Sequence, residues 1–331
     1  MRWFCVVLAV LCVSLLPGCL PSRVTIDLSP PAGELEESVV DDDGLSPIGF
    51  GPKVALFDVE GMITEQPTGV VFESRTSMVD RFVAKLDKAA GDSRVRAVVL
   101  RINSPGGTVS ASETLASEIR RFRERTGKPV IASFAEVAAS GGYYAALPCD
   151  DILAQPSSIT GSIGVIIQTF NVSRGMSMIG VKGRAVTSRE NKDIANPFED
   201  VDEEHYEILQ GMVDEFYAGF RARVLESRPI AESDVARVTD GRVFTGATAH
   251  ELGLVDELGG VRDAFTLAKQ RAGVERARLV KYHREGVSLS TPYARAQLGT
   301  VRREGSEDPI DRLSGALRPG AYYLWTAGSF R

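Results

Sequence analysis

The feature that most constrains the fold is a continuous apolar run, VRAVVLRI, at residues 95–102. Such a run is typical of a strand that is buried on both faces of a sheet. Similar runs occur at 53–61 and 129–135, and apolar residues recur at helical spacing in 74–90 and again after residue 109. Strands and helices therefore alternate, which predicts an α/β fold with a largely parallel sheet.

The helix after residue 109 is expected to begin with a capping box formed by Ser110 and Glu113 and to end at Gly127. A long helix is expected at 202–226, and two more within 241–273. We find no internal repeat and no second domain of comparable size.

The pattern predicts one folded domain over residues 53–285 and a C-terminal extension over 286–331. The extension ends in an aromatic patch that we expect to dock on a partner subunit or on the domain itself: Tyr322, Tyr323, Leu324 and Trp325.

Residues 1–18 read as a secretory signal: a basic residue is followed by an apolar run too short for the roughly 20 residues that span a bilayer. The sequence LPGC that follows resembles a bacterial lipobox, so Cys19 is expected to carry lipid; the alternative is an ordinary signal cleaved nearby. Residues 19–52, rich in Pro, Gly and acidic side chains, are expected to form a flexible tether. After cleavage only Cys149 would remain unmodified, which predicts no disulfide.

Charge and motif content exclude several functions. The net charge is −6 and no dense Lys/Arg run occurs, which argues against nucleic-acid binding. The three histidines, His205, His250 and His283, stand in polar settings, so we do not expect a Ser-His-Asp triad. No zinc motif is present, and the acidic triplet at 41–43 is expected to belong to the tether.

Three short stretches contain the remaining candidate functional groups, which are backbone N–H groups, a serine and a lysine. Gly106 and Gly107 follow a buried strand and can present backbone N–H groups to a developing oxyanion. Ser140, in AASGGYY, follows the next strand among residues small enough to let a substrate backbone approach. Lys192 lies in a polar loop, 188–198. Each stretch alone has an ordinary structural explanation as a turn, a tight helix or an exposed loop.

Taken together, the motifs RINSPGG, AASGGYYAAL, TGSIGV, SRENKDI and DGRVFTGATAHELGLVDELGG resemble the signal peptide peptidase A (protease IV) family in its short, single-domain form. The resemblance covers about residues 53–285. It implies a ClpP/crotonase-like fold, a spiral of β-β-α units. Many relatives carry an uncleaved membrane anchor, whereas this chain shows the lipobox.

The resemblance also implies a role for each matching residue. Ser140 corresponds to the nucleophile and Lys192 to the general base. The N–H of Gly106, with that of Gly107, corresponds to the oxyanion hole, and Ser162 to a hydroxyl that orients the lysine. The reaction is acyl transfer through an acyl-enzyme and needs no metal or organic cofactor.

A lysine acts as a base only when it is neutral, and burial in an apolar pocket is one way to favour that form. The residues beside Lys192 are polar, so its burial must come from elsewhere. In the family the serine and the lysine of one site come from neighbouring subunits. The resemblance therefore implies a homo-oligomeric ring with shared active sites, inactive as a monomer.

The expected substrates are cleaved signal peptides and other unfolded peptides. They would be cut on the extracytoplasmic side of a bacterial membrane, where the lipid anchor holds the protein. The resemblance implies a preference for small or apolar residues at the cleavage site. Two alternatives remain. One is a crotonase-like acyl-CoA enzyme, against which the export signal argues, and the other is an inactive lipoprotein scaffold of the same fold.

Overall fold

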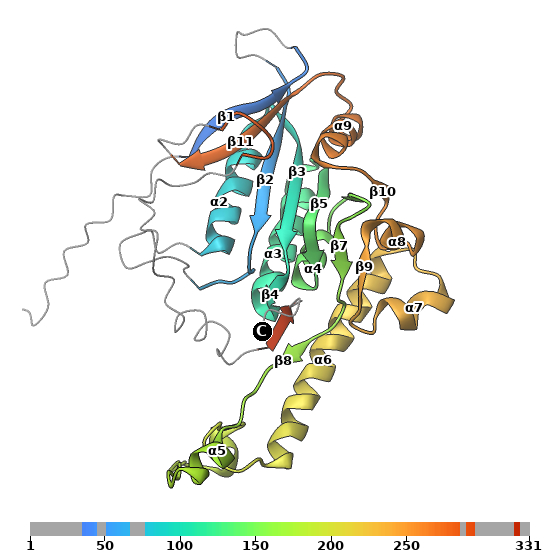
Figure 1. Ribbon diagram of the computed structural model, residues 1–331. Helices are drawn as coiled ribbons and strands as arrows, with labels where there is room; N and C mark the ends of the chain where they lie inside the picture. Colours follow the sequence, from blue (N-terminus) through green and yellow to red (C-terminus); the bar gives the residue numbers. More distant parts are fainter. Residues whose placement is uncertain (1–34, 45–50, 67–76, 285–288, 295–320, 325–331) are drawn as a thin grey trace, which may run out of the picture.

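The computed structural model describes residues 35–44, 51–66, 77–284, 289–294 and 321–324 (Figure 1). The expected signal peptide and Cys19 lie outside these residues. Within the described ranges, no helix combines the length and the apolar character needed to cross a bilayer.

Most of the strands join one sheet. The strands are β1 (Leu35–Asp42), β2 (Lys53–Glu60), β3 (Val95–Ser104), β4 (Gly106–Thr108), β5 (Val130–Ala139), β6 (Asp151–Ala154), β7 (Ile159–Gly161), β8 (Ile166–Ile167), β9 (Val243–Thr245), β10 (Glu257–Leu258), β11 (Arg278–Arg284) and β12 (Ala321–Leu324). The main sheet has the order β1-β11-β2-β3-β5-β6-β10, and β7 pairs with both β5 and β9. Its central pairings, from β11 through β10, are all parallel, as expected for an α/β fold.

Helices cover both faces of this sheet. They are α2 (Met78–Gly91), α3 (Val109–Thr126), α4 (Gly141–Ala146), α5 (Ser173–Met178), the 3-10 turn η1 (Glu190–Asp193), α6 (Glu203–Ser227), α7 (Glu232–Val238), α8 (Gly246–Glu251) and α9 (Val261–Arg271). The packing of strand β3 on both faces explains why its sequence is apolar throughout. Its Val98 and Leu100 pack into the cluster with α2 and α3, whereas Ala97 and Val99 pack into the cluster with α9.

The helix ends agree with the sequence except at one point. Gly127 ends α3 in the left-handed conformation, with φ 65°, as predicted. The capping box expected at Ser110 is wrong. The N-cap is Thr108, whose Oγ1 accepts a hydrogen bond from Ala111 N at 3.3 Å, because the chain turns into the helix directly after β4.

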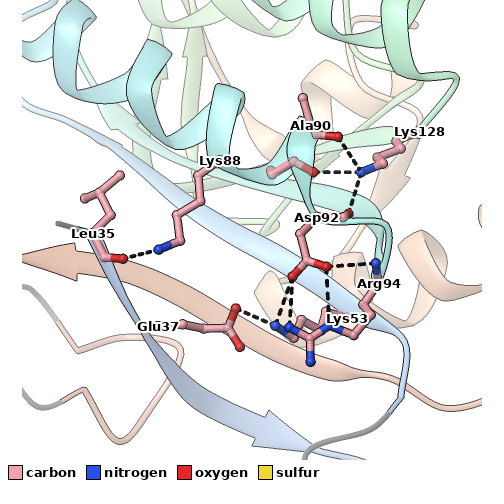
Figure 2. Close-up of polar contacts among 9 residues, drawn as sticks. Leu35, Glu37, Lys53, Lys88, Ala90, Asp92, Arg94 and Lys128 are labelled. Carbon is pink, nitrogen blue, oxygen red and sulfur yellow. Dashed lines mark hydrogen bonds and ion pairs between the residues drawn. The ribbon is translucent and has the colours of Figure 1, made fainter.

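The expected tether is in part a strand of the main sheet. Leu35–Asp42 forms β1, antiparallel to β11. Ion pairs fix it to the domain: Lys53 Nζ lies 2.7 Å from Glu37 and 3.0 Å from Asp92, and Lys88 Nζ donates to the Leu35 carbonyl (Figure 2). The sequence suggested a tether because β1 is acidic and half exposed, and its basic partners are distant in the chain.

The acidic triplet at 41–43, also assigned to the tether, forms part of the same attachment. Its three carboxylates pair with Arg262, Arg278 and Lys269.

A second, smaller sheet has the order β4-β12-β8, with both pairings antiparallel. The described part of the C-terminal aromatic patch, β12, therefore docks on the domain of its own chain, one of the two predicted alternatives. Trp325 lies outside the described residues. Figure 1 shows β12 between β4 and β8, below the main sheet.

Residues 164–219 form an arm that begins at β8 of the small sheet and extends away from the main sheet (Figure 1). It contains β8, α5, η1 and most of α6, and none of its residues is buried. The apolar stripe of α6 becomes buried only at Phe220, whereas Met212 on the same stripe is 42% exposed. The arm thus has no core of its own in one chain.

Candidate active site

Ser140 stands at the junction of β5 and α4. Its N–H donates to Gly161 O on the neighbouring strand β7 at 2.8 Å, and its own carbonyl accepts from Tyr144 N at 2.9 Å. The backbone of Ser140 has φ 53° and ψ −117°, a conformation that residues other than glycine rarely adopt. Such a backbone costs about 1–3 kcal/mol and is held in place by its surroundings, a pattern typical of active sites.

The Ser140 side chain is fully buried. Its Oγ has no hydrogen-bond partner among the described residues. A buried hydroxyl without a partner loses about 1–3 kcal/mol of solvation, so an ordinary packing serine would normally find one.

The glycines after Ser140 are required by close contacts. A Cβ on Gly141 would lie 2.4 Å from Ser112 Oγ, and a Cβ on Gly142 would lie 2.8 Å from Ser104 O. The small-residue sequence therefore lets the turn at Ser140 pack directly against the loop after β3.

That loop, SPGG, packs against the first residues of α4. A Cβ on Gly107 would lie 1.8 Å from Ile63 O, so this position admits only glycine. Ser104, fully buried, braces the loop: its Oγ donates to Gly61 O at 2.6 Å and accepts from Gly106 N at 3.1 Å. Ser104 was not singled out in the sequence, although the quoted RINSPGG motif contains it.

The hydrogen bond to Ser104 bears on the role expected of Gly106. Its N–H donates to Ser104 Oγ at 3.1 Å and is therefore engaged within this chain. Gly107 N lies 3.1 Å from the position of a Cβ on Gly141, so the backbone of Gly107 packs closely against the residue that follows Ser140. Gly141 directly follows the nucleophile candidate, and the sequence analysis assigned it no role.

Ser162 lies close to this centre. Residues Ala139 and Gly161 are paired between β5 and β7, so Ser140 and Ser162 follow them side by side. Ser162 is 8% exposed and also has a positive φ, 51°, and its N–H donates to Arg242 O at 2.8 Å. It is thus fixed by backbone contacts next to the Ser140 turn.

Lys192 is not brought to Ser140 within one chain. It lies on η1 in the arm, its side chain is exposed, and it forms no side-chain hydrogen bond or ion pair with the described residues. Ser140 Oγ has no hydrogen-bond partner among the described residues, so neither Lys192 nor any of the three histidines is hydrogen-bonded to it. His283, for example, is buried elsewhere, with Nε2 2.7 Å from Ser38 Oγ.

A strained, buried serine close to the backbone of two glycines has candidate parts of an acyl-transfer site: an oxygen nucleophile and N–H donors for the oxyanion that forms when it attacks a carbonyl. This is the arrangement expected of a serine hydrolase.

Comparison with known proteins identifies the family. The model of peptidase family S49 matches residues 123–275. A protease of Synechocystis is 38% identical over 67% of this chain and 76% of its own length. A signal peptide peptidase SppA of Enterococcus faecium is 31% identical over 75% and 70%, and protease 4 of Salmonella typhi is 35% identical over 74% and 38%. The chain belongs to peptidase family S49, the SppA or protease 4 family of serine peptidases.

Solved structures with a similar fold include a membrane-bound stomatin-specific protease in complex with a substrate peptide, 17% identical, with a TM-score of 0.43 over 66% of this chain and 80% of that one. ClpP1 of Listeria monocytogenes is 16% identical, with a TM-score of 0.41 over 63% and 93%. The predicted α/β fold with a largely parallel sheet is confirmed by the strand order and pairings of the structure.

Proposed function

We propose that this peptidase is a serine endopeptidase with a Ser/Lys dyad, in which Ser140 is the nucleophile and Lys192 the general base. The observation that carries the proposal is the state of Ser140: buried, strained, without a hydrogen-bond partner and beside the N–H groups of Gly107 and Gly141. The motif that contains Lys192 matches the family base, and the exposed, unpaired lysine is free to serve another chain.

In the proposed reaction, Lys192 takes the proton of the Ser140 hydroxyl while Oγ attacks the peptide carbonyl carbon. The negative charge on the carbonyl oxygen is stabilised by the two N–H groups. The amine leaves with the proton from Lys192, and an acyl-Ser140 ester remains. Water then hydrolyses the ester by the same steps in reverse order, with the lysine again as base.

Lys192 would come from a neighbouring subunit of a homo-oligomeric ring. Two features support this arrangement. The arm that carries Lys192 has no core, and its tip exposes large apolar side chains: Met178 is 83% exposed, Ile179 77% and Val186 97%. Apolar surface of this kind marks an interaction site, and burial against a second subunit would also favour the neutral form of the lysine.

The proposed setting is a bacterial membrane, with Cys19 lipidated and the catalytic domain on the extracytoplasmic side, in the periplasm where the envelope has one. Two acyl chains would anchor the protein stably. Peptides released near the membrane, above all cleaved signal peptides, would then be its substrates.

Within the proposed site, Ser162 would orient Lys192.

The decisive experiment compares Ser140→Ala and Lys192→Ala on a fluorogenic apolar peptide. Each variant is expected to lose at least about 10³-fold in kcat/KM, since members of a catalytic unit are not replaceable singly. Lys182→Ala is the matched control, because Lys182 is an exposed lysine of the same arm. Its activity should equal that of the wild type.

A mixture of the two inactive variants tests the shared site. Random assembly of equal amounts should restore about one quarter of the sites, because each site then needs an intact serine from one subunit and an intact lysine from the next. Dilution below the assembly threshold should abolish wild-type activity. Full activity per monomer after dilution, or no recovery in a co-assembled mixture, would contradict the shared site. Unchanged cleavage by Ser140→Ala would contradict the dyad.

A further inference from the structure

Strand β5 leaves the regular sheet just before it reaches the candidate nucleophile. It pairs with β3 along one edge and, near its end, with β7 along the other (Figure 1). Phe134 pairs with Ile102, but the next paired residue of β5 is Ala138, opposite Ser104. Residues 135–137 therefore form a bulge, called here the β5 bulge, opposite a single residue of β3. Bulges are frequent next to active sites, where they redirect a side chain.

The residue of β3 opposite the β5 bulge is Asn103, and its side chain binds the bulge. Oδ1 of Asn103 accepts a hydrogen bond from Val137 N at 3.1 Å. The backbone of Asn103 remains paired with β2, and its carbonyl accepts from Gly61 N at 3.0 Å. The side chain thus supplies an acceptor to the β5 backbone at the point where the ladder with β3 is interrupted.

Two hydroxyl groups bind the same part of β5 from its opposite edge. Thr160 of β7 stands opposite Ala138, is fully buried, and donates from Oγ1 to Ala138 O at 2.7 Å. Ser158, which is also buried, donates from Oγ to Ala135 O. Backbone groups of the β5 bulge and of the residue after it are therefore bound by side chains from both edges of the strand.

These bonds end two residues before the strained position. Ala138 is bound by Thr160, and Ser140 then has φ 53° and ψ −117°. A backbone of this kind persists only where the surrounding structure holds it. Beyond Ala138, Ser140 N donates to Gly161 O on β7 at 2.8 Å. The placement of the end of β5 against β7 therefore decides where the turn at Ser140 lies.

We infer that Asn103 and Thr160 are positioning residues of the active site. They hold the end of β5 so that Ser140 keeps its strained backbone and its hydroxyl keeps its direction. Both act through the β5 backbone, at Val137 N and Ala138 O, and not through the reacting atoms. The inference rests on the proposed function of Ser140. It gives a role to the asparagine of RINSPGG and to the threonine of TGSIGV.

The first test, on the full chain, separates shape from hydrogen bonding at Thr160. Thr160→Val keeps the branched shape and loses the donor, whereas Thr160→Ser keeps the hydroxyl and loses a methyl group. On the fluorogenic peptide we expect Thr160→Val to lower kcat about tenfold or more, with KM within about twofold of the wild type. Thr160→Ser should retain most of the activity. A packing role predicts the reverse order, because serine leaves a gap the size of a methyl group and valine leaves none.

Thr239→Val is the matched control. Thr239 is also buried, and its Oγ1 also donates to a backbone carbonyl, that of Val235 at 2.8 Å, but it lies at the end of α7. This variant should lose stability in urea and keep its kcat.

The second test makes the corresponding pair at Asn103. Asn103→Asp keeps the Oδ1 acceptor, whereas Asn103→Leu has a similar size and removes it. Only Asn103→Leu should lower kcat, by a factor similar to that of Thr160→Val, because both remove one bond to the same segment of β5. If a variant at one position does not fold, the pair at the other position decides.

Hydrogen exchange provides a readout that needs no catalysis. Backbone amides of residues 135–144 should exchange faster in Thr160→Val and Asn103→Leu than in the wild type, and at the wild-type rate in Thr239→Val. Unchanged exchange, a wild-type kcat in both variants, or a larger loss in Thr160→Ser than in Thr160→Val would overturn the positioning role. If exchange becomes faster but the wild type cleaves no peptide, the proposed function fails while the hold on the Ser140 turn stands.

Discussion

The region around Ser140 and the arm that carries Lys192 are built in opposite ways. The backbone near Ser140 is tightly packed: the glycines at 107, 141 and 142 leave no room for a Cβ, Ser104 braces the loop and the serine itself is fully buried. From residue 164 to 219 no side chain is buried. One chain therefore combines a tightly packed candidate site with an arm that has no core of its own. The difference is what the proposed function requires: a rigid site where transition-state charge would form, and an arm that a second chain would cover.

The largest effect that separates the two regions should come from adding one methyl group to a glycine. Gly107→Ala places a Cβ 1.8 Å from Ile63 O, where backbone would have to move, and should cost about 3 kcal/mol or more and abolish activity. Gly175→Ala, in the arm helix α5, meets nothing within 4 Å and should be neutral or slightly stabilising. Urea unfolding measures both, and equal destabilisation would contradict the contrast.

The same contrast explains how much the sequence could predict. The strands at 53–61 and 95–102 were found because apolar runs report burial on both faces directly. The serine turn and its glycines were found because their composition is unusual. The sequence could not distinguish Gly106 from Gly107 as candidate donors, because both are glycines of one turn. In the structure the N–H of Gly106 donates to Ser104 Oγ.

Long-range pairing accounts for the other errors. β1 is acidic and looked like a tether because its partner β11 is more than 200 residues away and its cations lie on several elements. β12 is likewise recognisable only through β4 and β8. Local patterns predict elements whose burial is local, and they fail where distant segments supply it.

A smaller effect is expected from the arm surface. Replacing both Met178 and Ile179 by serine removes apolar side chains that are exposed in one chain, so the free energy of unfolding of the monomer should change by less than about 0.5 kcal/mol. If a second subunit covers these residues, assembly and activity should both decrease. Val39→Ser, on the half-exposed strand β1, is the control and should affect neither. Sedimentation velocity and peptide cleavage measure the outcome, and full assembly of the double variant would contradict an interface at the arm tip.

The smallest effect concerns pH and again distinguishes the domain from the arm. Partial burial opposes ionisation of Asp92, but hydrogen bonds from the Arg94 backbone and from Lys53 outweigh it and lower its pKa to about 2 (Figure 2). A carboxyl whose folded pKa lies below its ordinary value stabilises the protein above about pH 4, and this contribution is lost as the pH falls towards 2. Asp92→Asn should therefore lower stability at neutral pH and flatten the acid limb of the stability curve, by a modest amount because the group is partly exposed. Asp214→Asn, on the exposed arm helix α6, should leave the curve unchanged. Chemical unfolding between pH 2 and 7 measures both variants, and an acid limb as steep in Asp92→Asn as in the wild type would show that the attachment of β1 through Lys53 does not depend on this charge.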